Sequence, residues 1–169
     1  MKRVLFALIC FISLHSVNAQ LPSQPTEAPY LKNPGIPPFK LLEVDSVTYL
    51  TKDVLKKNQL VLLIFFSPEC EHCKHQMHDI LDNFSQFKDI QIVMATFQPF
   101  DEMKAFYTYY RIADHSNIHM GRDEHYMLPP FFRMQSLPYL ALYDKKGQMI
   151  THFEGNQKID TILNAYKTK

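Results

Sequence analysis

The chain has 169 residues, of which 46% are hydrophobic and 21% charged, and its formal net charge is +1. This length and composition fit one domain with a full hydrophobic core. The near-neutral charge without a basic patch excludes a protein built to bind nucleic acid, and no apolar run predicts a membrane span in the mature chain.

The first 19 residues have the layout of a secretory signal peptide. A basic start, Lys2-Arg3, precedes an apolar stretch over residues 4–14 and a small-residue end at Ala19. The apolar stretch is shorter than the ~20 residues that a membrane-spanning helix needs. A lipoprotein anchor at Cys10 is disfavoured because it would cut the apolar stretch in half. We therefore expect cleavage between Ala19 and Gln20 and an exported mature protein, periplasmic or secreted.

Residues 20–38 form a proline-rich extension, which we interpret as an extended spacer or as a strap over the surface of the domain, 39–169. From residue 39 onward, hydrophobic periodicity predicts alternating strands and helices. We expect strands over 39–44 (a sheet edge), 60–66, 90–96, 139–143 and 148–153, with a hairpin turn at 144–147. We expect helices over 45–57, 70–87, 99–112 and 157–167. This order predicts an α/β fold, with a central mixed β-sheet flanked by helices on both faces.

Two cysteines, Cys70 and Cys73, lie at the start of the predicted helix 70–87. Unpaired backbone N–H groups and the helix dipole favour a thiolate there. With about 100° of rotation per residue, Cys73 lies on the apolar face of the helix, whereas Cys70 can face solvent. We therefore predict that Cys70 is the nucleophile, that Cys73 is the resolving thiol, and that the two form a redox-active disulfide without any bound cofactor.

The segment Ser67–Lys74 after a strand, together with Ser136-Leu137-Pro138-Tyr139 before another, resembles the thioredoxin superfamily, and more narrowly the exported bacterial thioredoxin-like thiol–disulfide oxidoreductases. The resemblance covers about residues 39–167. It implies a three-layer thioredoxin-like fold in which Pro138 is the cis-proline and the Leu137 backbone pairs with an extended substrate. It also implies disulfide exchange with exported protein partners and an upstream redox partner. We expect a monomer.

The chain departs from thioredoxin in ways that leave its direction of exchange open. It has no tryptophan, and the strand over 60–66 lacks a buried aspartate to accept the Cys73 proton. Extra residues, placed at 113–132, form an insertion before the cis-proline strand. Between the cysteines, a protonated His72 would stabilise the Cys70 thiolate and Glu71 would oppose it, so we expect this pair to tune the redox potential.

Two alternative functions also use this segment. Copper or zinc binding would draw on the cysteines and on His75 and His78, although helical geometry disperses these ligands. A thiol peroxidase would use Ser67, three residues before Cys70, but Leu63 stands where that motif has a proline.

Overall fold

A seven-stranded mixed sheet forms the centre of the molecule in the computed structural model, which describes residues 27–167. The strand order is β2-β1-β5-β4-β3-β6-β7; β3, β4 and β5 run parallel, and the other neighbours pair antiparallel. The strands are β1 (Lys40–Leu42), β2 (Tyr49–Thr51), β3 (Leu60–Phe65), β4 (Ile90–Thr96), β5 (Ile118–Arg122), β6 (Tyr139–Tyr143) and β7 (Met149–Glu154). The predicted signal peptide lies outside the described residues.

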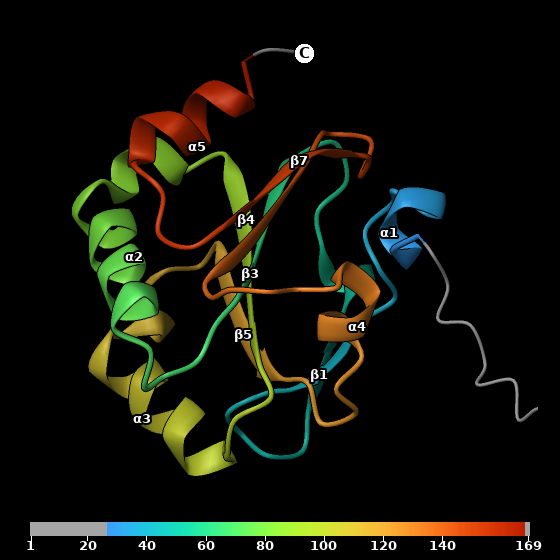
Figure 1. The fold of residues 1–169 in the computed structure, drawn as a ribbon. Helices are drawn as coiled ribbons and strands as arrows, with labels where there is room; N and C mark the ends of the chain where they lie inside the picture. The colour runs from blue at the N-terminus through green and yellow to red at the C-terminus, as the bar shows by residue number, and fades with distance from the viewer. Residues whose placement is uncertain (1–26, 168–169) are drawn as a thin grey trace, which may run out of the picture.

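Helices cover both faces of this sheet (Figure 1). On one face lie α2 (Glu71–Asp82), α3 (Phe100–Tyr109) and α5 (Ile159–Ala165), and on the other lie α1 (Pro29–Lys32) and α4 (Leu128–Phe132). The predicted three-layer α/β fold is therefore confirmed. The predicted helix 70–87 divides into α2 and a 3₁₀ turn at Phe84–Phe87.

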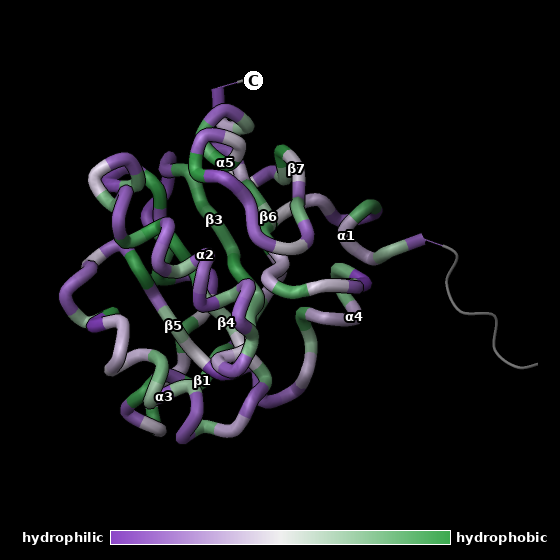
Figure 2. Tube along the Cα trace, turned by 60° about the vertical axis from the view of Figure 1, so that its left-hand side comes forward, coloured by the Kyte–Doolittle hydropathy of each residue, from purple (hydrophilic) through white to green (hydrophobic). Residues whose placement is uncertain are grey.

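The central strands carry the core because both of their faces are buried. In β3, Leu62 and Ile64 pack toward α2, whereas Leu63 and Phe65 pack toward α4. None of these four side chains is more than 2% exposed. Figure 2 shows the resulting hydrophobic stripe along β3. The continuous apolar run predicted this, since a central strand covered on both faces has no polar side.

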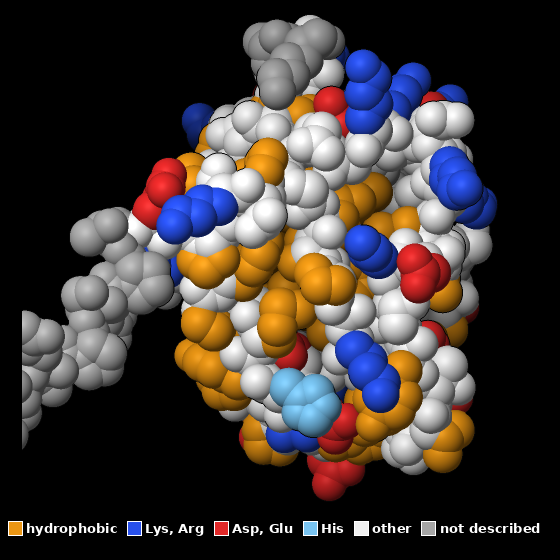
Figure 3. Space-filling view, turned by 90° about the vertical axis from the view of Figure 1, so that its right-hand side faces the viewer, with side chains coloured by type: hydrophobic (Ala, Val, Ile, Leu, Met, Phe, Trp, Pro, Cys, Tyr) orange, Lys and Arg blue, Asp and Glu red, His pale blue; other side chains and the backbone are white. Residues whose placement is uncertain are grey.

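The described part of the proline-rich extension lies against the domain as a strap. Gly35 bridges to Gln148, and the Met149 N–H donates to the Pro34 carbonyl at 2.8 Å. The Tyr30 ring packs edge-on against His152, with centroids 5.3 Å apart. Figure 3 shows hydrophobic side chains gathered on this side of the molecule, which carries α1 and α4.

The helix predicted over 45–57 is wrong. Residues 49–51 form β2, which pairs antiparallel with β1, and Lys52–Val54 forms only a 3₁₀ turn. Asp45 accepts the N–H groups of Val47 and Thr48, at 2.9 and 2.8 Å, and so stabilises the hairpin turn. Because β2 lies outside β1, the predicted edge strand is also not the edge.

One strand inside the sheet, β5, is missing from the prediction. It lies within the predicted insertion 113–132 and pairs parallel with β4 and antiparallel with β1. Only two of its residues, Ile118 and Met120, show the alternation typical of a strand, and His119 and Arg122 make it look polar. The short helix α4 completes the inserted segment.

Two tyrosines, Tyr143 and the partly buried Tyr166, give a matched test of hydrogen-bond satisfaction. The Tyr143 hydroxyl is buried without a hydrogen-bond partner in the described structure, whereas the Tyr166 hydroxyl donates to the Val61 carbonyl at 2.8 Å. We expect Tyr143→Phe to raise the free energy of unfolding by about 1 kcal/mol and Tyr166→Phe to lower it by about 1 kcal/mol. Urea unfolding of both variants measures this, and a destabilised Tyr143→Phe would contradict it.

Candidate active site

Cys70 lies at the N-terminal end of α2, directly after the turn that follows β3. Its N–H donates to the Ser67 carbonyl at 3.1 Å, and its own carbonyl accepts the N–H groups of Cys73 and Lys74, both at 3.0 Å. Cys70 is thus the N-cap residue of α2, with extended backbone angles and a half-buried side chain. Its sulfur stands where the first N–H groups of the helix favour negative charge.

Cys73 lies on the buried face of α2 and is only 3% exposed. Burial raises the pKa of the Cys73 thiol well above its usual range, and a hydrogen bond with Cys70 raises it further, while the Ser67 backbone opposes this. Both cysteines are free thiols in this structure. At neutral pH, Cys73 therefore stays protonated beneath the more accessible Cys70.

The loop before β6 brings a distant segment to this helix end. The Leu137–Pro138 peptide bond is cis, and Tyr139 pairs with Phe65 at the end of β3. The Cys70 sulfur lies 4.0 Å from the Leu137 carbonyl oxygen, within reach of a weak S–H···O contact. The two predicted parts of the site are therefore in contact.

The two residues between the cysteines both lie at the surface. Glu71 pairs with Lys74, with 2.8 Å between Oε1 and Nζ. This bond lowers the pKa of Glu71 and raises that of Lys74. His72 is exposed, on a groove of about 1120 Å³ between α2 and α3. Lys74 had no predicted role, although it compensates part of the Glu71 charge.

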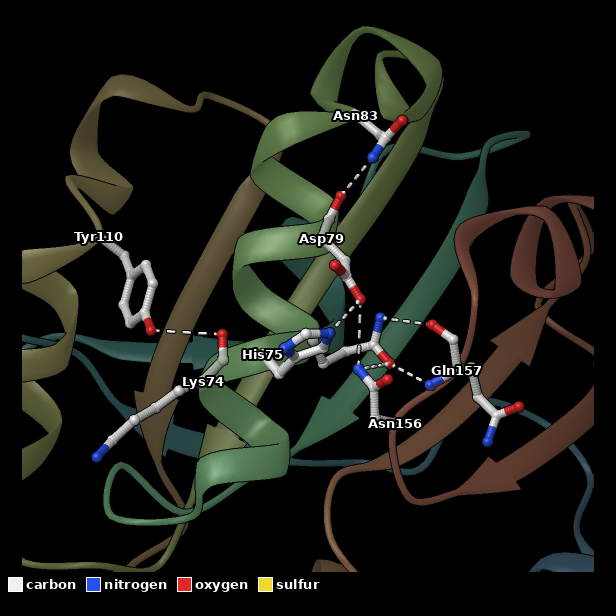
Figure 4. Close-up of polar contacts among 8 residues, drawn as sticks. Lys74, His75, Asp79, Asn83, Tyr110, Asn156 and Gln157 are labelled. Carbon is white, nitrogen blue, oxygen red and sulfur yellow. Dashed lines mark hydrogen bonds and ion pairs between the residues drawn. The ribbon is translucent and has the colours of Figure 1, made fainter.

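A buried polar residue on α2, Gln76, is a part of the site that the sequence analysis missed. It is 1% exposed, and its Oε1 accepts the Gln157 N–H at 2.7 Å while its Nε2 donates to the Gln157 carbonyl at 3.2 Å. Asn156 donates to Gln76 and to Asp79, and Asp79 also faces His75 (Figure 4). Helical phase could have identified Gln76, since it lies one turn after Cys73 on the same face.

The residues of the metal-binding alternative do not converge, and the peroxidase motif has a leucine at its proline position. Across residues 27–167, no three His, Cys, Asp or Glu side chains gather closely enough to hold a metal ion. His75 instead faces Asp79, and His78 packs edge-on against Tyr110. Leu63 is fully buried in β3, on the side of the sheet away from α2.

This arrangement of sheet, cysteine helix and proline loop defines the thioredoxin-like fold of thiol–disulfide oxidoreductases. The family model for the thioredoxin-like domain matches residues 49–168. The chain therefore belongs to the thioredoxin-like domain family. Comparison with curated protein sequences gives no match.

Two of the solved structures with the same fold are described as a secreted protein and as an exposed lipoprotein. A secreted disulfide oxidoreductase of Mycobacterium tuberculosis, described as homologous to Escherichia coli DsbE, has 13% identity and a TM-score of 0.64, over 78% of this chain and 96% of its own. The exposed lipoprotein thioredoxin Etrx1 of Streptococcus pneumoniae has 22% identity and a TM-score of 0.60, over 78% and 98%. At these identities the likeness establishes the fold. Within residues 27–167, no helix is long and apolar enough to cross a bilayer.

Proposed function

We propose that this protein is a thiol–disulfide oxidoreductase that exchanges disulfides with exported protein partners through Cys70 and Cys73. The observation that carries the proposal is the pairing of a half-exposed Cys70 with a buried Cys73 at one helix end, with the Leu137 carbonyl 4.0 Å from the Cys70 sulfur. An accessible thiol above a buried one is what a two-step exchange needs.

The reaction follows from the different environments of the two sulfurs. In the reducing direction, the Cys70 thiolate attacks a partner disulfide, and one partner sulfur leaves as a thiolate. The resulting mixed disulfide joins Cys70 to the partner. Cys73 then loses its proton and attacks the Cys70 sulfur, which releases the second partner thiolate. The partner gains two electrons, and the protein is left with a Cys70–Cys73 disulfide; the oxidising direction reverses these steps.

The residues around the cysteines have distinct proposed roles. The Leu137 backbone, next to Pro138, pairs with an extended partner segment by strand addition. His72 favours the Cys70 thiolate, and Glu71 opposes it with a charge that its bond to Lys74 weakens. We propose a periplasmic or secreted location, in keeping with the secreted and surface-exposed proteins that share this fold.

A reduction-potential measurement against glutathione tests the function and its direction. We expect the isolated protein to equilibrate with glutathione through one two-electron Cys70–Cys73 couple. A reduction potential of about −270 mV would identify the protein as a reductant, and one of about −120 mV would identify it as an oxidant. A protein whose cysteines do not exchange with glutathione would contradict the proposal.

The buried Cys73 gives the resolving step a characteristic pH dependence. Because its pKa is raised, only a small fraction of Cys73 is thiolate at neutral pH, and this fraction grows about tenfold per pH unit below the pKa. We expect the Cys70–partner mixed disulfide to resolve about tenfold faster for each unit between pH 7 and 9. Stopped-flow measurement of the release of a labelled partner peptide gives this rate. A rate that does not change with pH would show that deprotonation of Cys73 does not limit the resolving step.

A further inference from the structure

A four-residue segment, Glu154–Gln157, contacts both halves of the candidate site. It begins at the last residue of β7 and ends just before α5, far in sequence from either cysteine. At its start, one oxygen of Glu154, Oε2, accepts the N–H groups of Gln135 and Ser136 at 3.2 and 2.7 Å. These two donors belong to the loop that leads into Leu137 and Pro138.

The next residue, Gly155, holds the same loop from the other side of Pro138. Its N–H donates to the Pro138 carbonyl at 2.9 Å. Gly155 has a φ of +75°, in the left-handed region that favours glycine, although a Cβ there would meet no atom within 4 Å. Backbone conformation, rather than space, therefore calls for glycine at this position.

The end of the segment holds the cysteine helix. The backbone N–H and carbonyl of Gln157 both bond to the buried side chain of Gln76, one turn after Cys73. Asn156 adds bonds to Gln76 and Asp79, at 3.3 and 3.5 Å (Figure 4). A single short segment thus ties α2 to the sheet end that carries Leu137.

We infer that Glu154 is a positioning residue, which holds the 135–138 loop so that the Leu137 backbone presents a partner segment to Cys70. The inference rests on the proposed function. Glu154 bonds to the loop and not to either sulfur, so it acts on docking of an extended partner and leaves the intrinsic reactivity of Cys70 unchanged. Electrostatic attraction strengthens its hold, since a carboxylate oxygen accepts N–H bonds more strongly than a neutral oxygen.

The opposite end of the same hairpin supplies a matched control. Asp144 uses one oxygen, Oδ1, to accept the N–H groups of Lys146 and Gln148, both at 2.8 Å. Asp144→Ala and Glu154→Ala therefore each remove a carboxylate of which one oxygen accepts two backbone N–H groups. Only the second of these changes touches the loop beside Cys70.

The test measures how fast the reduced protein reacts with two disulfides that have the same leaving group. One is the small reagent bis(2-nitro-5-thiobenzoate) disulfide, and the other is an extended peptide whose cysteine is linked to 2-nitro-5-thiobenzoate. Cys70 attacks either disulfide and releases the coloured thiolate, so one absorbance signal reports both rates. The small reagent needs no strand addition, whereas the peptide does.

For Glu154→Ala, we expect the second-order rate constant with the peptide to fall about tenfold, and the rate with the small reagent to change less than twofold. Glu154→Gln, which keeps an acceptor oxygen, should recover most of the peptide rate, and Asp144→Ala should leave both rates within about twofold. Equal losses with both disulfides, an unchanged peptide rate, or an equal effect of Asp144→Ala would overturn the inference. If the unmodified protein reacts with neither disulfide, the proposed function fails and this inference fails with it.

Discussion

Cys70→Ser is expected to abolish disulfide exchange, lowering the rate by roughly a thousandfold or more, because it removes the only accessible sulfur of the pair. The fold should survive this change. Cys70 is the N-cap residue of α2, and serine is among the residues preferred at that position. Thermal unfolding should therefore show that Cys70→Ser is as stable as the reduced unmodified protein, or slightly more stable. The loss of activity is then due to the missing thiol and not to unfolding.

Cys73→Ser supplies the complementary outcome. It keeps Cys70, the proposed nucleophile, and removes the proposed resolving thiol. We expect the Cys70–partner adduct to accumulate and to be seen by mass spectrometry of the intact protein. If instead Cys70→Ser trapped the partner on Cys73, the roles of the two sulfurs would be the reverse of those proposed.

The difference in burial between the two sulfurs could be predicted from sequence because its signals are local. The apolar run over 60–66 predicts a strand buried on both faces, and the helical phase after it separates Cys73 from Cys70. Both features depend on residues within one turn or one strand of each other. The structure gives Cys73 the buried position that the phase predicts, with 3% exposure.

The elements that were mispredicted depend on pairing between distant segments. Strand β2 forms within residues 45–57, which have an apparent helical spacing, but Val47 and Val54 of that spacing are 74% and 50% exposed. Likewise, β5 becomes a strand because β4 and β1 bond to either side of it. Strand propensity reflects such neighbours more than the residue itself.

The same reasoning separates the site residues that were found from those that were missed. Glu154 has no local signal, because its partners Gln135 and Ser136 are 19 and 18 residues away and contribute backbone groups, which every residue has. Gln76 did have a signal, since a polar side chain on the buried face of a helix requires a hydrogen-bond partner. That partner, the Gln157 backbone, is 81 residues away and could only be found in the fold.

Gly121→Val is expected to destabilise the protein by about 3 kcal/mol, the largest effect on stability among the substitutions considered. A Cβ at Gly121 of β5 would lie 2.7 Å from the Leu41 Cβ and 3.0 Å from the Leu42 carbonyl oxygen, both on β1. One of these atoms is a Cβ and the other a backbone carbonyl oxygen, so no change of side-chain rotamer can relieve the contact. The β1–β2 hairpin must then move away from β5.

Gly35→Ala is the control for this prediction, because a Cβ there would lie 3.9 Å from its nearest neighbours. We expect its effect on urea unfolding to stay within about 0.5 kcal/mol. Exchange by folded Gly121→Val should continue at a similar rate, since the cysteines stand on β3 and α2 and the displaced hairpin lies at the far edge of the sheet. If Gly121→Val were as stable as Gly35→Ala, β1 could move away from β5 without loss of stability. Close packing of β1 against β5 would then not stabilise this edge of the sheet.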